Sequence, residues 1–223
     1  MSELVEYTVT SQVATLRMDD GKANAYGPAM IESLSAALDR AAGEARATVI
    51  RGRDGVLCAG FDLKIIRGDD EAAREAMRSA GRELLYKAYM HPQPLVFACT
   101  GHALAAGALL LLTGDHRFGV RGDFKIGLNE TGIGLPLPPF GLEIARDRLH
   151  PAHLTAATVL GTVYSPEDAL AAGYLDDVVA VAELDAAAQA RAEQLAALDT
   201  TAVAVTKRRL RQMTKARAEA VQD

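Results

Sequence analysis

The stretch from Pro94 to Asp115 constrains the fold more than any other part of the chain, because it is almost free of charge and consists of small and apolar residues. β-forming residues at 95–97 come first, and the helix-forming run 108–112 follows. We therefore predict a buried strand that turns at 100–102 into a buried helix opening at 105–107. A turn of such small residues lets a ligand approach the backbone, and the free N–H groups of a first helical turn attract negative charge.

Strand and helix signals alternate along the rest of the chain, which indicates one α/β domain with a sheet covered by helices. Pro28 suits the first position of a helix, and Ser165 and Gly173 suit the start and end of another. The other predicted strands are 4–9, 12–18, 47–50, 56–64 with a break at Gly60, 116–120, 124–128 and 174–181. The other predicted helices are 70–90, 140–149, 182–198 and 202–221.

The balance of charge limits the classes of partner. The chain has 29 acidic and 24 basic residues, so we expect it to bind neither nucleic acid nor a membrane surface. The stretch 94–115 approaches the length of a membrane span, but Pro94 and the polar turn at 100–102 interrupt it. The N-terminus shows no basic and apolar leader, and two cysteines are too few for a disulfide framework. We therefore expect a cytoplasmic protein.

Three places carry groups that suit chemistry on an anion. The turns at 59–61 and 105–107 each present backbone donors beside small side chains, and two such donors that converge on one oxygen form an oxyanion hole. Glu130 lies in a loop between apolar residues, where a raised pKa suits a proton-transfer base. Taken alone, these patterns leave other interpretations open, since small residues also serve tight packing and a loop glutamate can face water.

Together and in this order, the three places resemble the crotonase (enoyl-CoA hydratase/isomerase) superfamily over nearly the whole chain. Residues 22–25 (KANA) resemble the substrate loop of that family, 58–64 (CAGFDLK) its first oxyanion segment, and 101–107 (GHALAAG) its second. The resemblance assigns the two oxyanion donors to the backbone N–H groups of Phe61 and Ala106.

The resemblance also implies the fold, the substrate and the assembly. It implies a spiral of ββα units over 1–180 and a shortened helical segment over 181–223 that takes part in the contacts of a homotrimer or hexamer. The substrate is an acyl-CoA thioester, with coenzyme A as part of the substrate and with no metal or separate cofactor. The implied substrate- and CoA-binding residues are Lys22, Ala23, Ala25, Ala59, Asp62, Leu63, Lys64 and Gly107, and the implied acyl-pocket residues are Leu109 and Phe140.

The glutamates of the family separate two reactions. Its hydratases use two glutamates, whereas its Δ3,Δ2-enoyl-CoA isomerases move a double bond with one. In this chain the first position is Leu109 and the second is Glu130. Since leucine exchanges no proton, the resemblance favours isomerisation with Glu130 as the single base, and a hydratase or a non-catalytic acyl-CoA-binding protein is the alternative.

We interpret the remaining polar residues as parts of the core or the surface, and not of the site. We expect His102 to pack beneath the oxyanion helix and Cys58 to be a small core residue. The basic cluster of the last helix is interpreted as a solvated face; its members are Lys207, Arg208, Arg209 and Arg211.

Overall fold

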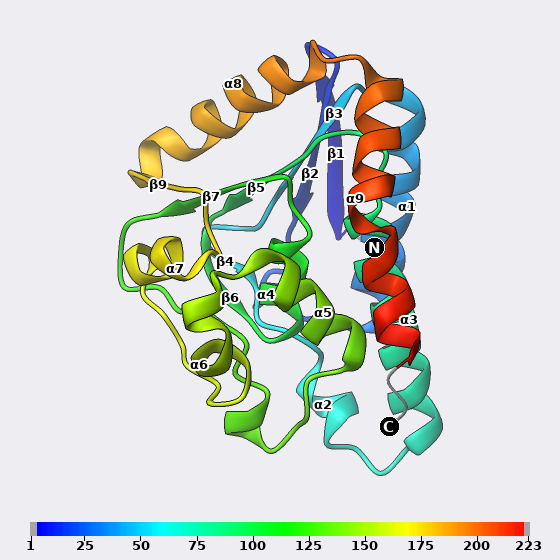
Figure 1. Ribbon diagram of the computed structural model, residues 1–223, viewed down its shortest axis with the longest axis vertical. Helices are drawn as coiled ribbons and strands as arrows, with labels where there is room; N and C mark the ends of the chain where they lie inside the picture. Colours follow the sequence, from blue (N-terminus) through cyan, green and yellow to red (C-terminus); the bar gives the residue numbers. More distant parts are fainter. Residues whose placement is uncertain (1–3, 221–223) are drawn as a thin grey trace.

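A six-stranded sheet runs through the computed structural model, which describes residues 4–220 (Figure 1). Its first two strands form an antiparallel hairpin, as predicted, and every other pair of neighbours is parallel. The order across the sheet is β1 (Val5–Thr10), β2 (Val13–Met18), β3 (Ala47–Arg51), β5 (Leu95–Cys99), β7 (His116–Val120) and β9 (Asp177–Val179).

A second sheet consists of three short parallel strands, β4 (Gly55–Cys58), β6 (Gly101–Leu104) and β8 (Ile126–Gly127). Each of them follows directly on a strand of the large sheet: β4 follows β3, β6 follows β5, and β8 follows β7. Helical segments then lead to the next pair of strands. The chain thus repeats a ββα unit in a spiral, as the resemblance implies.

The prediction for the stretch 94–115 is wrong at its middle. Residues 100–102 do not turn into the helix, because β5 passes into β6 and helix α4 (Ala106–Leu112) begins only after Ala105. At Gly101, a Cβ atom would lie 2.1 Å from the Gly55 carbonyl oxygen, so this glycine belongs to the strand beside β4. The polar residues at 100–102 therefore mark the passage from one sheet to the other, and not the start of the helix.

Helices cover both faces of the large sheet (Figure 1). α1 (Pro28–Glu44) and α3 (Glu71–Tyr89) pack together on one side, and α8 (Leu184–Ala196) packs across β3, β5 and β7 on the other. Alternating side chains of β5 therefore serve two cores, Phe97 with the first side and Val96 with α8.

The remaining helical segments are short, apart from α5 (Pro139–Arg148) and α9 (Thr200–Ala220). α2 (Leu63–Ile66) and α6 (Leu154–Thr158) have no counterpart among the predicted elements, and the predicted strands 56–64 and 174–181 shorten to β4 and β9. The other segments are α7 (Pro166–Ala172) and the 3-10 turns η1 (Thr131–Ile133), η2 (Pro151–His153) and η3 (Val181–Glu183).

The basic cluster of α9 is not a solvated face, so that interpretation is wrong for half of its members. Lys207 and Arg211 are buried and bind the carboxylate of Asp115, with Arg211 Nη2 2.8 Å from Asp115 Oδ1. Arg208 and Arg209 are exposed. The buried pair meets an acidic residue far away in the sequence, which a local pattern cannot show. Within residues 4–220, no helix is long and apolar enough to cross a membrane.

Candidate active site

The three predicted chemical positions lie at the same end of the small sheet. Its order is β4, β6, β8, and all neighbours are parallel, so the residues after each strand leave the sheet at one edge. Phe61 follows β4, Ala106 follows β6, and Glu130 follows β8. The Ala105 N–H also donates to the Gly127 carbonyl oxygen at 3.0 Å, which ties the turn before α4 to the end of β8. The carboxyl ends of parallel strands are the usual place for a ligand in such sheets.

The two glycine turns touch each other. At Gly60, whose φ is +96°, a Cβ atom would lie 3.0 Å from the Cβ of Ala105 and 3.6 Å from the nitrogen of Ala106. Glycine therefore permits both the backbone conformation and the close approach of the second turn.

The N–H of Phe61 points away from the loop 22–26. Tyr26 N–H donates to the Gly60 carbonyl oxygen at 2.8 Å, and Asp62 N–H donates to the Tyr26 carbonyl oxygen at 3.2 Å. These bonds flank Phe61 in a parallel bridge, and successive N–H groups of an extended segment point to opposite sides. The Phe61 N–H thus points away from Tyr26. The ring of Phe61 packs on helix α3, because a Cβ at Gly81 would be 2.5 Å from it.

The N–H of Ala106 is the second donor at this edge. Ala106 is the first residue of α4, so its N–H has no acceptor within the helix. Ala105 before it has φ 49° and ψ −124°, values rare for an alanine, and strain of this kind clusters at functional turns. Gly107 lets the helix rest on β4, since a Cβ there would lie 2.2 Å from the carbonyl oxygen of Cys58. Cys58 is a buried core residue, as expected.

Glu130 is a buried carboxyl group with one unpartnered oxygen. The residue is 7% exposed, and its Oε2 has no hydrogen-bond partner. Burial raises the pKa of Glu130 to about 7, because the charged form loses its hydration. The interpretation of a loop glutamate that faces water is therefore excluded, and the group is suited to exchange a proton near neutral pH.

Leu109 and Phe140 lie in the interface between α4 and α5. Leu109 is 1% exposed and packs on Gly141, where a Cβ would come within 2.9 Å of Leu109 Cδ1. The Phe140 ring meets the rings of Tyr86 and Tyr89 at centroid distances of 5.8 and 6.1 Å. Leu109 thus brings an apolar surface, and no proton donor, to the helix that starts with Ala106.

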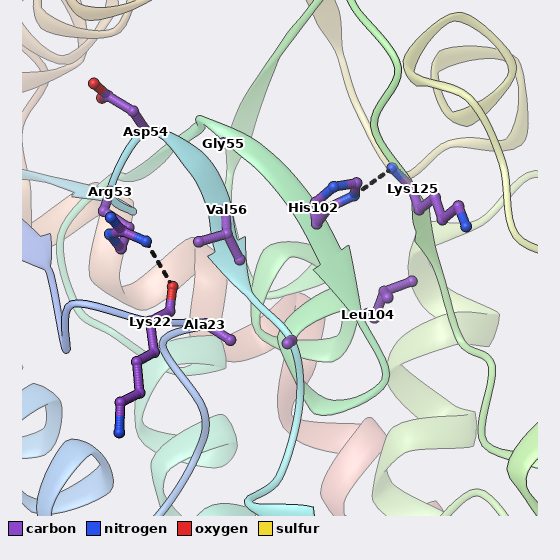
Figure 2. A pocket seen from close by; sticks show the side chains of 10 residues that line it. Lys22, Ala23, Arg53, Asp54, Gly55, Val56, His102, Leu104 and Lys125 are labelled. Carbon is purple, nitrogen blue, oxygen red and sulfur yellow. Dashed lines mark hydrogen bonds between the residues drawn. The ribbon is translucent and has the colours of Figure 1, made fainter.

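An open groove of about 500 Å³ runs beside the two turns (Figure 2). Lys22, Ala23 and Ala59, three of the predicted CoA-binding residues, line it. Arg53 and Lys125 line it too and add positive charge that the sequence interpretation missed. Arg53 Nη1 donates to the Lys22 carbonyl oxygen at 2.8 Å, a contact between distant segments that only the fold creates.

The other predicted binding residues do not line this groove. Asp62 caps α2 by accepting the Lys64 N–H at 2.9 Å, and the side chains of Leu63 and Lys64 are exposed on that helix. Ala25 is held in the loop by Asp20, which accepts its N–H at 3.3 Å.

His102 lies in β6 and does not pack beneath α4 as expected. It lines the groove, and its Nδ1 accepts the Lys125 N–H at 2.9 Å (Figure 2). Because β6 takes the place of the predicted turn, the side chain of His102 lies at the groove. No group of three or more metal-ligating side chains occurs in the described part of the chain.

Comparisons with known proteins agree with this geometry. The family model described as enoyl-CoA hydratase/isomerase matches residues 8–223. A family protein from Pseudomonas syringae has a similar structure, with a TM-score of 0.94 and 40% identity over 98% of this chain and 95% of that one. An enoyl-CoA isomerase from Mycobacterium tuberculosis gives a TM-score of 0.93 and 40% identity over 99% and 96%.

The names of the relatives cover both reactions. Human mitochondrial enoyl-CoA delta isomerase 1 is 28% identical over 218 residues, which are 96% of this chain and 72% of that protein. A probable enoyl-CoA hydratase from Rhodobacter capsulatus is 35% identical over 112 residues, which are 50% of this chain and 44% of that protein. Similarity alone therefore does not separate isomerisation from hydration.

Proposed function

The chain belongs to the enoyl-CoA hydratase/isomerase family and has the crotonase fold, and from that premise we propose that it converts 3-enoyl-CoA thioesters into 2-enoyl-CoA thioesters with Glu130 as the single base. The observation that carries the proposal is the buried carboxyl group of Glu130, whose Oε2 has no hydrogen-bond partner. It lies at the same end of the small sheet as the two backbone donors, and helix α4 carries no second carboxylate.

The oxyanion donors act on the thioester carbonyl. When its oxygen lies between the N–H groups of Phe61 and Ala106, negative charge that develops on the oxygen is stabilised by donors already fixed in place. The bond from Ala105 to Gly127 and the contact of Gly60 with Ala105 support this convergence. The donors thereby lower the energy of the enolate relative to the bound substrate.

Glu130 moves one proton. Its carboxylate takes a proton from C2, and the electrons of that C–H bond form a dienolate whose negative oxygen the two N–H groups hold. The protonated Glu130 then gives the proton to C4, so the double bond shifts from C3–C4 to C2–C3. Substrate and product are isomers, and the reaction consumes neither water nor a redox cofactor.

The pKa of Glu130 suits both halves of the reaction. A carboxyl with an ordinary pKa would be a weak base, whereas one raised to about 7 takes up and releases a proton with little bias near neutral pH. Because the base must be ionised to start, we expect kcat/KM to fall as the pH drops below about 7.

Hydration needs a second group that positions the water or protonates the substrate. Among the described residues, the expected position for this group is occupied by Leu109. Leu109 is buried against Gly141, and α4 has the sequence AGALLLL, without an ionisable side chain. Among the buried carboxylates of residues 4–220, the other glutamate is Glu143, which is bound to Arg217 of α9. These facts support isomerisation over hydration.

The groove is proposed as the site of the CoA moiety. Lys22, Arg53 and Lys125 supply positive charge for its phosphates, and Ala23 and Ala59 leave room beside the turns. For Ala25, Asp62, Leu63, Lys64 and Gly107, a role in binding the substrate stays a prediction, as does an acyl pocket at Leu109 and Phe140.

A homotrimer or hexamer is the assembly that we propose. The apolar side chains that follow α6 support it, because Val159 and Leu160 are 64% and 69% exposed. Light scattering should give about three or six times the mass of one 23.6 kDa chain, and a monomer would contradict the proposal.

The test compares two substrates and two variants. Purified protein should convert 3-enoyl-CoA and should hydrate 2-enoyl-CoA slowly or not at all. Glu130→Gln should lose about 10²–10⁴-fold in kcat, the usual contribution of an acid–base residue. Glu143→Gln, a matched change at a buried but paired glutamate, should keep the rate of the folded enzyme. Rapid hydration that survives Glu130→Gln would overturn the proposal, and acyl-CoA binding without turnover of either substrate would point to a binding protein.

A further inference from the structure

The loop between β2 and α1 contains a buried polar side chain that the proposed mechanism does not use. Asn24 is 0% exposed and has a φ of +50°, in the left-handed region that asparagine and aspartate enter more easily than most other side chains. Burying an amide costs stability unless its donors and its acceptor are paired. The partners of Asn24 therefore show which parts of the molecule it holds together.

The amide of Asn24 joins the two sheets. Its Nδ2 donates to the carbonyl oxygen of Met18, the last residue of β2, at 3.0 Å. The same nitrogen donates to the carbonyl oxygen of Leu57 in β4 at 3.1 Å. Since β4 is the strand that leads to Phe61, both N–H groups of this amide hold the loop to the backbone before the first oxyanion donor.

Asp20 closes the loop around Asn24. The Asp20 N–H donates to Asn24 Oδ1 at 3.0 Å, and the Asn24 N–H donates back to Asp20 Oδ1 at 2.9 Å. The Asp20 carboxylate also accepts the Lys22 N–H at 2.7 Å and the Ala25 N–H at 3.3 Å. Both donors and the acceptor oxygen of the Asn24 side chain are thus paired, and a satisfied buried network of this kind holds the loop in one conformation.

The far side of this loop holds the peptide group that carries the first oxyanion donor. The Ala59 N–H donates to the Ala23 carbonyl oxygen at 3.0 Å, and the Tyr26 N–H donates to the Gly60 carbonyl oxygen at 2.8 Å. The Gly60 carbonyl and the Phe61 N–H belong to one planar trans peptide group, in which they point in opposite directions. The bond from Tyr26 therefore sets the direction of the Phe61 N–H.

From these contacts we propose that Asn24 is a positioning residue that fixes the direction of the Phe61 N–H. Its amide holds the loop to β2 and β4, and the loop in turn holds the peptide group of Phe61. Asn24 does not line the groove, so it acts on the reaction through its neighbours. A donor stabilises developing charge best when it is already aimed, and misplacement by about 1 Å costs about 10²-fold in rate. The effect on the rate rests on the proposed function.

Two variants remove the Nδ2 donors and keep the backbone conformation. Asn24→Asp has nearly the same size and tolerates a φ of +50°, so it chiefly breaks the bonds to Met18 and Leu57. Asn24→Gly permits the same φ and adds no charge. A result shared by both variants therefore reflects the lost bonds, and not a new carboxylate or a strained backbone.

Gln93→Glu is the matched control. Gln93 is 6% exposed, and its Nε2 also donates to two backbone carbonyl oxygens, those of Ala42 and Ala45. It precedes β5 and thus lies at the opposite end of that strand from β6. The control loses the same kind of buried bonds far from the two oxyanion turns.

The kinetic test separates kcat from KM in the folded fraction of each protein. In both Asn24 variants we expect kcat for 3-enoyl-CoA to fall about tenfold to 10²-fold, while KM changes by less than about threefold. Gln93→Glu should keep both constants. If Asn24 only shaped the groove, KM would rise and kcat would stay.

The direct test needs no turnover. A saturated acyl-CoA labelled with ¹³C at the thioester carbonyl is bound to each protein, and the NMR shift of that carbon reports how strongly the donors polarise the C=O bond. We expect binding to displace the signal equally in the wild type and in Gln93→Glu. In both Asn24 variants about half of this displacement should be lost, because one of the two donors is misdirected.

The outcomes distinguish this proposal from the proposed function. A wild-type carbonyl shift in the Asn24 variants, or a rise in KM alone, would overturn the positioning role. Failure of both variants to fold would overturn it too, because Asn24 would then serve the fold and not the site. The expected shifts in a protein that isomerises no enoyl-CoA would overturn the proposed function alone. A carbonyl that binding leaves unshifted in the wild type would overturn both, since no oxyanion hole would be present.

Discussion

Two buried polar regions of this molecule differ in one respect, which is whether their charges are paired. Where α9 packs against the body, Asp115 binds Lys207 and Arg211, and Asp147 accepts the Tyr89 hydroxyl at 2.8 Å and binds Arg217. At the end of β8, Glu130 has no cation and an unpartnered oxygen. We call the first region the α9 anchor and the second the β8 site.

The difference shows what each region is for. Pairing in the α9 anchor satisfies buried charge and fixes the last helix against β5 and α5, so these groups serve the fold. An unpaired buried polar group costs about 1–3 kcal/mol of stability. A chain keeps such a group where binding or chemistry uses it, and the β8 site has its unpaired carboxyl beside two free backbone donors.

The largest effect on stability is expected in the α9 anchor. Asp115→Asn leaves the cations Lys207 and Arg211, 6% and 4% exposed, without their carboxylate. Removing one member of a buried ion pair costs about 3–5 kcal/mol, so the urea midpoint should drop strongly while the folded fraction keeps its kcat. Glu75→Gln, at an exposed carboxylate on α3, is the control and should change neither. A wild-type midpoint in Asp115→Asn would remove the distinction between the two regions.

The β8 site should instead weaken the fold as it ionises. The pKa of Glu130 is about 7 in the folded protein against 4.5 for an ordinary glutamate, so the folded state binds the proton more tightly. Stability is therefore fully present below about pH 4.5 and decreases as the pH rises through 7, by about 3 kcal/mol in total. Urea titrations at several pH values should show this slope in the wild type and lose it in Glu130→Gln. Equal slopes in both proteins would mean that Glu130 is not buried and unpaired.

A change at the touching turns should affect the reaction more than the fold. Gly60→Ala forces a Cβ to 3.0 Å from Ala105 and a side chain onto a residue with φ +96°. Displacement of the Phe61 N–H should lower kcat about 10²-fold, close to the loss of one oxyanion donor. Gly43→Ala, on α1 with nothing within 4 Å of the added Cβ, is the control. If both variants keep the wild-type kcat, the turns do not form the oxyanion hole.

The smallest effect is expected at the rim of the groove. Lys22 is exposed, so Lys22→Ala should raise the KM for acyl-CoA about threefold to tenfold and leave kcat unchanged, as expected for a screened surface charge. Arg208→Ala removes an equally exposed charge on α9 and should leave KM as it is. Kinetics at two salt concentrations would check the assignment, because the difference should shrink at high salt.

The sequence predicted the groups that local pattern and family motif determine. Phe61, Ala106 and Glu130 fall at one sheet edge because each follows a strand, and strand order can be deduced from the ββα resemblance. The passage from β5 to β6 was not predicted, because the polar residues at 100–102 are compatible with a turn into a helix as well as with a change of sheet. The burial of Lys207 and the place of His102 and Arg53 in the groove depend on segments far apart in the chain, and no local pattern encodes them.

The claim that one glutamate moves the proton is tested most directly by following that proton. A 3-enoyl-CoA with deuterium at C2 is converted in ordinary water in a single turnover, and the product is analysed by NMR for deuterium at C4. Since Glu130 is 7% exposed before the substrate covers it, exchange with solvent should be slow, and a substantial part of the deuterium should appear at C4. A product whose C4 carries only hydrogen from the solvent would contradict the claim.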